Sequence, residues 1–274
     1  MPDAIAIQPF FHPPTGTWSY IASRGSDAVV IDPVLDYDAG DGRTGTTAAD
    51  VLLAHLDSQG LRLHYVLETH AHADHLSAAA YLTSRTGAQV AIGAGIRAVQ
   101  AHFANGFGLR VDDPAFVDAF DRLLKDGDVL DAGELRIEVI ATPGHTPDGL
   151  SYRMGNNVFV GDTLFAPDVG TARCDFPGGS VEQLHNAIQR LHALPDDTVL
   201  WLCHDYPPAG RAPRAWIPVA ESRRDNTMAA ARIAADAFHA ARRARDATLS
   251  PPALLRPALQ VNLRGGRLPA QDRR

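Results

Sequence analysis

Short apolar runs closed by glycine or proline alternate with longer amphipathic segments along most of the chain. Three runs near the N-terminus have the partial alternation of antiparallel strands joined by turns: Ile5–Phe11, Trp18–Ala22 and Ala28–Ile31. Thr47–Gln59 is rich in helix-forming residues, and Gly60 follows it in the position of a C-terminal cap. The pattern therefore predicts three strands and a helix before the next apolar run, Tyr65–Leu67.

The middle of the chain predicts further elements of both kinds. Asp74 is placed to cap a helix over His75–Thr86, and Gln89–Ile92 follows as a short strand. A helical stretch is expected from Ile96 to Leu124, with an interruption near Gly106–Pro114.

The second half repeats this order. Its expected strands are Val129–Leu130, Leu135–Ala141, Leu150–Met154, Val158–Val160 and Val199–Leu202. The expected helix between the last two is Val181–Ala193. Strands and helices in both halves predict the α+β class and a four-layer αββα sandwich.

The C-terminal part differs in composition. Ser222–Thr248 is rich in alanine and arginine and is expected to be helical. Residues 250–274 contain Pro251-Pro252 and Gly265-Gly266, and the run from Pro257 to Gly266 alternates like a strand. We therefore expect one catalytic domain over residues 1–249 and an extended tail over residues 250–274.

Net charge and cysteine content limit the possible partners and the cellular compartment of the protein. The 274-residue chain has a net charge of −7, which disfavours a nucleic-acid partner because phosphate contacts need a basic surface. Two cysteines, Cys174 and Cys203, are too few for a disulfide framework, and no signal peptide or long apolar span stands out. These features predict a cytoplasmic protein with no membrane contact. Both cysteines are expected to be dispensable for function, and strand alternation predicts that the side chain of Cys203 faces away from that of the following His204.

Candidate chemistry is concentrated in Thr69-His70-Ala71-His72-Ala73-Asp74-His75, directly after the apolar run Tyr65–Leu67. Three imidazoles and a carboxylate within seven residues suit a metal ion, which needs several such groups at one point. Three further candidates each follow an expected strand: His145 in a T-P-G-H-T sequence, Asp162 in G-D, and His204. Side chains at strand ends are held by the rigid sheet, so these four segments predict one metal centre.

This order of motifs resembles the metallo-β-lactamase superfamily over residues 5–225. Within it, Gly170-Thr171-Ala172-Arg173-Cys174-Asp175-Phe176 and His204-Asp205-Tyr206 resemble the persulfide dioxygenase (ETHE1-like) branch, which includes bacterial sulfur dioxygenases and β-lactamase-like hydrolases. The resemblance implies one Fe(II) per chain held by His70, His145 and Asp162, a two-histidine, one-carboxylate face with open positions for substrate and oxygen. The remaining candidates, His72, Asp74, His75 and His204, are then second-sphere or second-metal groups.

The same resemblance implies oxidation of a low-molecular-weight persulfide, foremost glutathione persulfide, by O2 to sulfite and thiol, as in sulfide detoxification. Arg173 matches an arginine that the family places near the active site, which implies a supporting role in catalysis by positioning the site or the anionic substrate. The alternative for it is a bidentate salt bridge with Asp175 or another carboxylate. Tyr206 matches a tyrosine near the iron that hydrogen-bonds substrate, and the alternative for it is packing. A homodimer and a separate sulfurtransferase chain are the candidate protein partners.

The ligand inventory leaves a second enzyme open. All seven ligands of a dinuclear site are present: His70, His72 and His145 for one metal, Asp74, His75 and His204 for the other, and Asp162 as the bridge. Two Zn(II) ions there would give a thioester hydrolase resembling glyoxalase II. A secreted β-lactamase, a nuclease and a non-catalytic sulfur-binding protein are less favoured.

Overall fold

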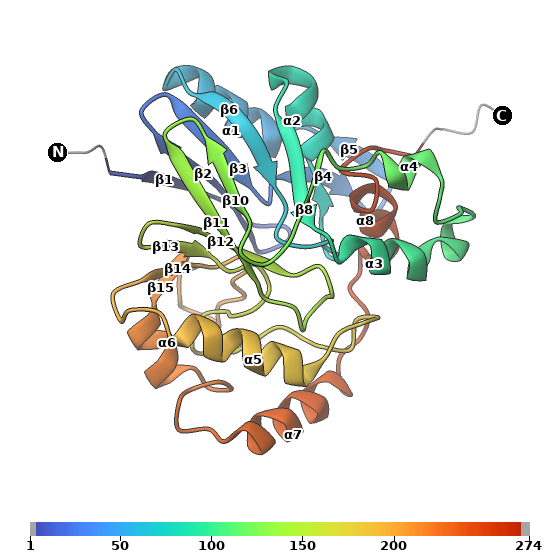
Figure 1. Cartoon of the computed structure of the whole chain (residues 1–274). Coiled ribbons are helices and arrows are strands. Elements are labelled where there is room, and N and C mark those ends of the chain that lie inside the picture. Colours follow the sequence, from blue (N-terminus) through green and yellow to red (C-terminus); the bar gives the residue numbers. More distant parts are fainter. Residues whose placement is uncertain (1–3, 270–274) are drawn as a thin grey trace.

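A computed structural model describes residues 4–269 of the chain. Two six-stranded sheets form its centre (Figure 1). The first has the order β1 (Ala6–His12), β2 (Thr17–Arg24), β3 (Asp27–Ile31), β6 (Arg62–Leu67), β8 (Gln89–Gly93) and β9 (Arg122–Leu124). The second has the order β10 (Val129–Ala132), β11 (Leu135–Ala141), β12 (Leu150–Met154), β13 (Asn157–Phe159), β14 (Val199–Trp201) and β15 (Trp216–Pro218). A small third sheet joins β5 (Arg43–Gly45), β4 (Val34–Asp38) and β7 (Leu76–Ser77).

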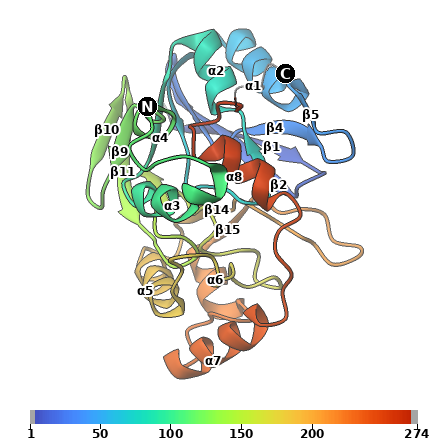
Figure 2. The same cartoon turned by 90° about the vertical axis from the view of Figure 1, so that its right-hand side faces the viewer.

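Helices cover the outer face of each large sheet (Figures 1 and 2). The first sheet packs against α1 (Thr47–Ser58), α2 (Ala79–Thr86), α3 (Ile96–Phe103), the short α4 (Pro114–Val117) and α8 (Leu255–Asn262). The second packs against α5 (Val181–His192), α6 (Val219–Asp225) and α7 (Ala235–Asp246). A third apolar core, with Tyr20, Val29 and Tyr152, lies between the sheets. The predicted αββα sandwich is therefore confirmed.

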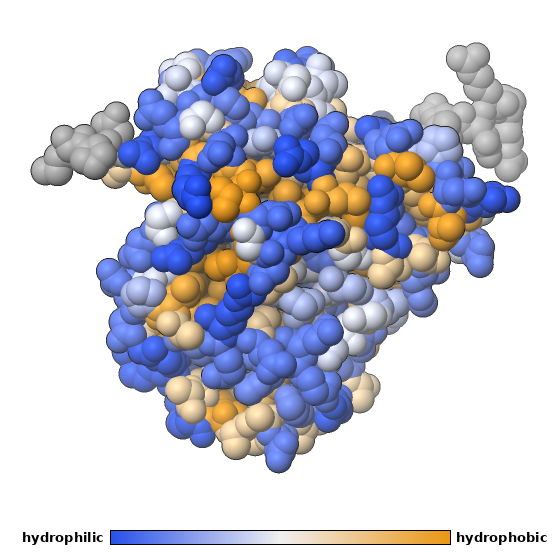
Figure 3. All heavy atoms as spheres, in the orientation of Figure 1, coloured by the Kyte–Doolittle hydropathy of each residue, from blue (hydrophilic) through white to orange (hydrophobic). Residues whose placement is uncertain are grey.

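The surface follows from this layering. On the face drawn in Figure 3, hydrophilic residues cover the helices at top and bottom, and a band of hydrophobic residues lies between them. Partly buried side chains such as Ile5 and Ile7 pack against the core between the sheets. The band thus marks the side of the sandwich that no helix covers.

Strand direction brings the ligand loops to one edge. β3, β6 and β8 are parallel neighbours in the first sheet, and β13 and β14 are parallel neighbours in the second. The carboxyl ends of parallel strands meet at the same edge, so the segments that follow β3, β6, β13 and β14 gather there.

The start of α2 differs from the prediction. Asp74 does not cap a helix over His75–Thr86, because Leu76–Ser77 pairs with β4 and α2 begins only at Ala79. The intervening residues belong to the ligand loop, which uses Asp74 as a candidate ligand.

The stretch from Ile96 to Leu124 is also less helical than predicted. After α3, a single 3₁₀ turn and α4, residues Arg122–Leu124 form β9 and pair in parallel with β8. Three residues carry too little sequence pattern to separate a strand from a helix end.

The tail is the largest difference. It is not extended: Leu255–Asn262 form α8, and its buried residues Ala258, Leu259 and Val261 enter the core of the first sheet. With Asn262 included, the buried residues recur three and four residues after Ala258, which fits a helix as well as alternation fits a strand, and packing decides between the two. The predicted helix over Ser222–Thr248 is divided into α6 and α7. The domain boundary at residue 249 stays a prediction, and residues 1–3 and 270–274 lie outside the described residues.

Candidate metal centre

Four loops at the shared edge of the sheets supply the candidate ligands. The loop after β6 carries His70, and the loop between β11 and β12 carries His145. Asp162 follows β13, and His204 follows β14. The structure therefore brings together all four segments that the sequence singled out.

Glycine is required beside two of these ligands. Gly144 has φ +142°, and a Cβ there would lie 2.3 Å from the backbone nitrogen of Leu184 in α5. Gly161 has φ +52°, and a Cβ there would lie 2.7 Å from Thr69. Only glycine tolerates both the backbone conformation and the close approach, which explains the G-H and G-D pairs of the motifs.

The first ligand group consists of His70, His145 and Asp162, whose ligand atoms lie within 4.8 Å of one another. The Asp162 Oδ2 atom lies 3.9 Å from His70 Nε2 and 3.7 Å from His145 Nε2. The other ring nitrogen of each histidine is engaged: His145 Nδ1 lies 2.7 Å from the carbonyl oxygen of Arg173, and His70 Nδ1 lies 3.0 Å from Thr69 Oγ1. Such contacts fix the tautomer and direct Nε2 at a metal.

The second ligand group consists of His72, Asp74, His75 and His204, also within 4.8 Å of one another. His204 Nε2 lies 3.2 Å from Asp74 Oδ2 and 3.6 Å from Asp162 Oδ1. Asp162 therefore directs one oxygen at each group. The Nδ1 atoms of His75 and His204 share a single hydroxyl, Thr17 Oγ1, at 3.4 and 3.3 Å.

Unpaired donor atoms show that the pocket fits a metal ion. Buried side-chain atoms of several candidate ligands have no hydrogen-bond partner among the described residues: His70 Nε2, His72 Nδ1, His75 Nε2, His204 Nε2 and Asp162 Oδ1. Buried polar atoms are nearly always paired, so a converging set of unpaired donors calls for a ligand. Imidazole nitrogen with carboxylate oxygen suits zinc or iron.

Burial keeps part of the site neutral. Burial, with the nearby His72 and His145, holds the pKa of His70 well below its ordinary value. Burial, with the charge of His72, lowers the pKa of His75 to about 4. A neutral imidazole keeps the lone pair that a metal needs.

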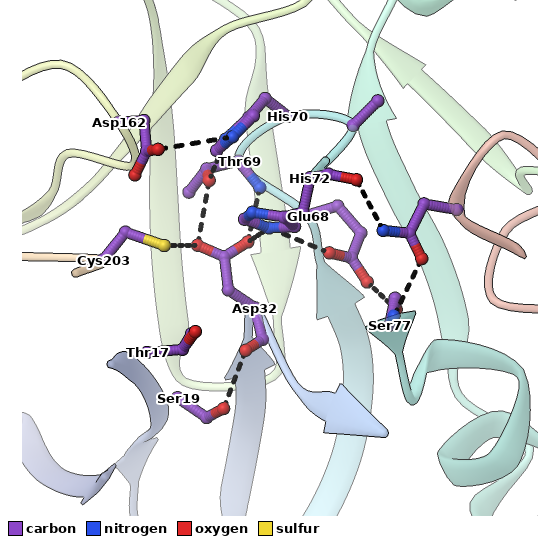
Figure 4. Close-up of polar contacts among 12 residues, drawn as sticks. Thr17, Ser19, Asp32, Glu68, Thr69, His70, His72, Ser77, Asp162 and Cys203 are labelled. Carbon is purple, nitrogen blue, oxygen red and sulfur yellow. Dashed lines mark hydrogen bonds and ion pairs between the residues drawn. The ribbon is translucent and has the colours of Figure 1, made fainter. Parts of the chain in front are cut away.

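Asp32 supports the ligand loop from below, and the sequence analysis missed this role (Figure 4). Its carboxylate accepts hydrogen bonds from the backbone nitrogen of Thr69 at 2.7 Å and from Thr69 Oγ1 at 2.8 Å, and lies 3.0 Å from His72 Nε2. Its φ of +47° is the one positive value outside glycine among the described residues. An aspartate that ends β3, next to the parallel strand that delivers His70, is the signal that could have revealed it.

Glu68 adds a second buried carboxylate beside His72. Its Oε2 lies 3.5 Å from His72 Nε2, and its other oxygen accepts a hydrogen bond from Ser77 Oγ. Burial alone would lower the pKa of His72, but the charges and hydrogen bonds of Asp32 and Glu68 outweigh burial and hold that pKa well above its ordinary value. The two carboxylates therefore orient the His72 ring through Nε2, and the buried Nδ1 atom has no hydrogen-bond partner among the described residues.

Arg173 and Tyr206 are placed differently from each other. The Arg173 guanidinium donates to both Asp175 oxygens, at 2.5 and 2.6 Å, and to the Ser250 carbonyl at 2.7 Å. This is the salt bridge expected as the alternative, and the residue reaches the centre through its carbonyl on His145. Tyr206 stacks on His204 and donates to Asp74 at 3.4 Å, but it is 51% exposed, so it is not a buried packing tyrosine. A substrate contact by either residue stays a prediction.

Cys203 corrects a prediction. It does not face away from the site, since its Sγ atom lies 3.6 Å from Asp32 Oδ2 (Figure 4). β14 ends at Trp201, so strand alternation no longer applies two residues later. Cys174 is buried, and burial raises its pKa to about 12, as expected of an unreactive thiol.

The structure bears on one part of the prediction that the protein has no membrane contact, namely the absence of a membrane-spanning helix among the described residues. Across residues 4–269, no helix combines the length and the apolar character that crossing a bilayer requires.

Comparisons with known proteins point to the same family as the sequence motifs. The profile described as Metallo-beta-lactamase superfamily matches residues 12–204. The chain is 46% identical over 283 residues to a probable metallo-hydrolase of Burkholderia pseudomallei, covering 98% of this chain and 95% of that protein. It is 46% identical to the Beta-lactamase hydrolase-like protein of Agrobacterium fabrum over 97% of this chain, which spans only 62% of that longer protein.

Two further similarities concern proteins named ETHE1, of which the human one is described as a persulfide dioxygenase. The chain is 28% identical to the mitochondrial persulfide dioxygenase ETHE1 of Homo sapiens over 207 residues, covering 74% of this chain and 69% of that protein. The crystal structure of ETHE1 from Myxococcus xanthus superimposes with a TM-score of 0.76 at 29% identity, covering 96% of this chain and 100% of that one.

Proposed function

Since the chain belongs to the metallo-beta-lactamase superfamily, we propose that it is an Fe(II)-dependent persulfide dioxygenase acting on glutathione persulfide or a related low-molecular-weight persulfide. In the balanced reaction, the persulfide, O2 and water give the thiol, sulfite and two protons. Both oxygen atoms of O2 are added to the terminal sulfur, which is oxidised, and the bond between the two sulfurs is broken.

The observation that carries this proposal is the composition of the first ligand group. His70, His145 and Asp162 form a set of two imidazoles and one carboxylate, with their ligand atoms within 4.8 Å of one another. Two histidines and a carboxylate on one face are typical of non-haem Fe(II) oxygenases, because three positions remain for substrate and oxygen. Bound iron would supply the redox chemistry that joins the two.

The protein's own side chains have binding and positioning roles. The Arg173 carbonyl and the Thr69 hydroxyl orient the two histidines. Phe176 lies beside His145, with ring centroids 6.0 Å apart, and gives that side of the centre an apolar wall. The exposed Tyr206 hydroxyl is the group that we assign to a hydrogen bond with the persulfide.

The similarities support the same reaction. The match to ETHE1 of Myxococcus xanthus extends over 96% of the chain, beyond the family profile that ends at residue 204. The Burkholderia relative is described as a metallo-hydrolase, so the relatives' names alone do not decide between oxidation and hydrolysis.

The direct test is O2 uptake by anaerobically Fe(II)-loaded protein given glutathione persulfide, with sulfite measured in the same sample. We expect uptake and sulfite in equal amounts, and neither in a His145→Ala variant. No uptake above that variant would reject the proposal for this substrate.

A specific observation also favours the dinuclear zinc hydrolase. Asp162 directs one oxygen toward each ligand group, as a bridging carboxylate would. Two zinc ions there would activate water and polarise a thioester carbonyl. Zn(II)-loaded protein that hydrolyses S-lactoylglutathione, combined with Fe(II)-loaded protein that takes up no O2, would establish this second function.

A further inference from the structure

Asn262, the last residue of α8, contacts the ligand loop with every polar atom of its side chain. Its Oδ1 accepts a hydrogen bond from the backbone nitrogen of Ser77 at 2.8 Å. Its Nδ2 donates to the carbonyl oxygens of His72 and His75, each at 2.8 Å. The residue is 4% exposed, so water does not substitute for these bonds.

The backbone groups that Asn262 holds belong to the ligands themselves. His72 and His75 each supply one imidazole to the second ligand group, and Asp74 lies between them. Because an amide is planar, one Asn side chain fixes three loop positions relative to one another. The loop has almost no regular secondary structure of its own between β6 and β7 to provide that order.

The rest of α8 makes Asn262 a fixed point. Leu259, Val261 and Leu263 are buried in the core of the first sheet. Gly265 has φ +65°, and a Cβ there would lie 2.1 Å from the Ala119 carbonyl oxygen, so the chain turns tightly directly after the helix. Gln100 of α3 donates to the Leu263 carbonyl at 2.9 Å and fastens the same helix end.

We propose that Asn262 is a positioning residue of the metal centre: it sets the backbone of His72 and His75 and thereby the affinity and geometry of metal binding. The C-terminal helix then becomes part of the centre, although it lies beyond the residues that match the family profile. This role goes beyond the proposed function, since it holds for oxidation and for hydrolysis.

Gln100 provides a matched control. It is also a buried amide, 2% exposed, and it also holds α8, yet it has no hydrogen bond with the ligand loop. Asn262→Leu and Gln100→Leu are therefore both expected to weaken the packing of α8 against the first sheet. Only Asn262→Leu also removes the hydrogen bonds to the ligand loop.

The test is Co(II) affinity, measured by competition with a chromophoric chelator, together with the visible absorption spectrum of the Co(II)-loaded protein. We expect Asn262→Leu to weaken the second Co(II) equivalent, which His72 and His75 help to bind, by about ten- to a hundredfold, the range typical of groups that orient metal ligands, and to change the spectrum. Gln100→Leu is expected to keep both the affinity and the spectrum. Thermal unfolding of the metal-free proteins identifies the temperature at which all are folded.

Unchanged Co(II) affinity and spectrum in Asn262→Leu would overturn the proposal, and so would an equal loss in both variants, which would show that docking of α8 alone matters. If a leucine variant does not fold, Asn262→Ser and Gln100→Ser give the same comparison. Serine is polar but too short to reach these partners, so we expect a loss for Asn262→Ser as well, and again none for Gln100→Ser.

Discussion

The two ligand groups are built from the same kinds of side chain, but they are held in different ways. In the first group, each histidine has its own hydrogen-bond partner, at 2.7 Å for His145 and 3.0 Å for His70. In the second, His72 contacts the carboxylates of Asp32 and Glu68, at 3.0 and 3.5 Å. The other two histidines, His75 and His204, share the Thr17 hydroxyl at 3.4 and 3.3 Å.

This difference bears on where a metal binds. Ligands whose orientation is fixed before binding lose less freedom when the metal arrives, so affinity is higher there. Each histidine of the first group has its own partner, whereas two histidines of the second share one hydroxyl, and the carbonyls of His72 and His75 depend on Asn262 in the C-terminal helix. We therefore expect one tightly held iron in the first group.

Removal of a ligand of the first group should cause the largest loss of activity. We expect His145→Ala to lower O2 uptake with glutathione persulfide by more than a hundredfold, beyond the ten- to hundredfold typical of groups that only orient ligands. Iron per chain after gel filtration checks the cause. A variant that keeps its iron and its turnover would show that His145 is not a ligand.

Substitution of Asp32, which holds the ligand loop, should have the next largest effect, a loss of metal affinity. Asp32→Asn keeps the size of the side chain, and asparagine tolerates the φ of +47° found there. It loses the charge beside Thr69 and His72. We expect Co(II) affinity to fall by about tenfold or more, by chelator competition, and equal affinity would contradict the supporting role.

The buried histidines predict a dependence of stability on pH in the metal-free protein. The folded-state pKa of His75, about 4, lies below its ordinary value, so the unfolded chain binds a proton between about pH 6.5 and pH 4 that the folded chain does not. Stability is therefore lost as the pH falls through this window. Relative to His75→Gln, we expect the wild type to lose about 2 kcal/mol between pH 7 and pH 5 in urea unfolding. Parallel curves for the two proteins would contradict the lowered pKa.

Removal of a second-group ligand should have the smallest effect. We expect His204→Ala to keep one iron per chain and to change O2 uptake by less than about tenfold, because the first group is intact. A loss as large as that of His145→Ala would make the two groups equivalent and favour a dinuclear centre.

The sequence predicted the centre better than its supports. His70, His145, Asp162 and His204 stood out because each follows an apolar strand in a short motif, and the αββα order followed from the alternation of strands and helices. Local pattern carries this information.

Residues that contact the metal centre from distant parts of the chain are not marked by any local sequence motif. Asn262 lies 185 residues after Ser77, and it sits in a segment whose apolar spacing fits a strand as well as a helix. The direction of Cys203 depends on where β14 ends, a boundary that tertiary pairing sets. Contacts of this kind are decided by packing, and so they were found only in the structure.

If our proposal is right, a single iron in the first ligand group is sufficient for persulfide oxidation. The most direct measurement is an anaerobic Fe(II) titration of the metal-free protein, with O2 uptake on glutathione persulfide recorded at each step. We expect uptake to rise linearly and to stop rising at one Fe(II) per chain, in the wild type and in His204→Ala alike. Activity that appears only with a second equivalent of metal, or that His204→Ala abolishes, would contradict it.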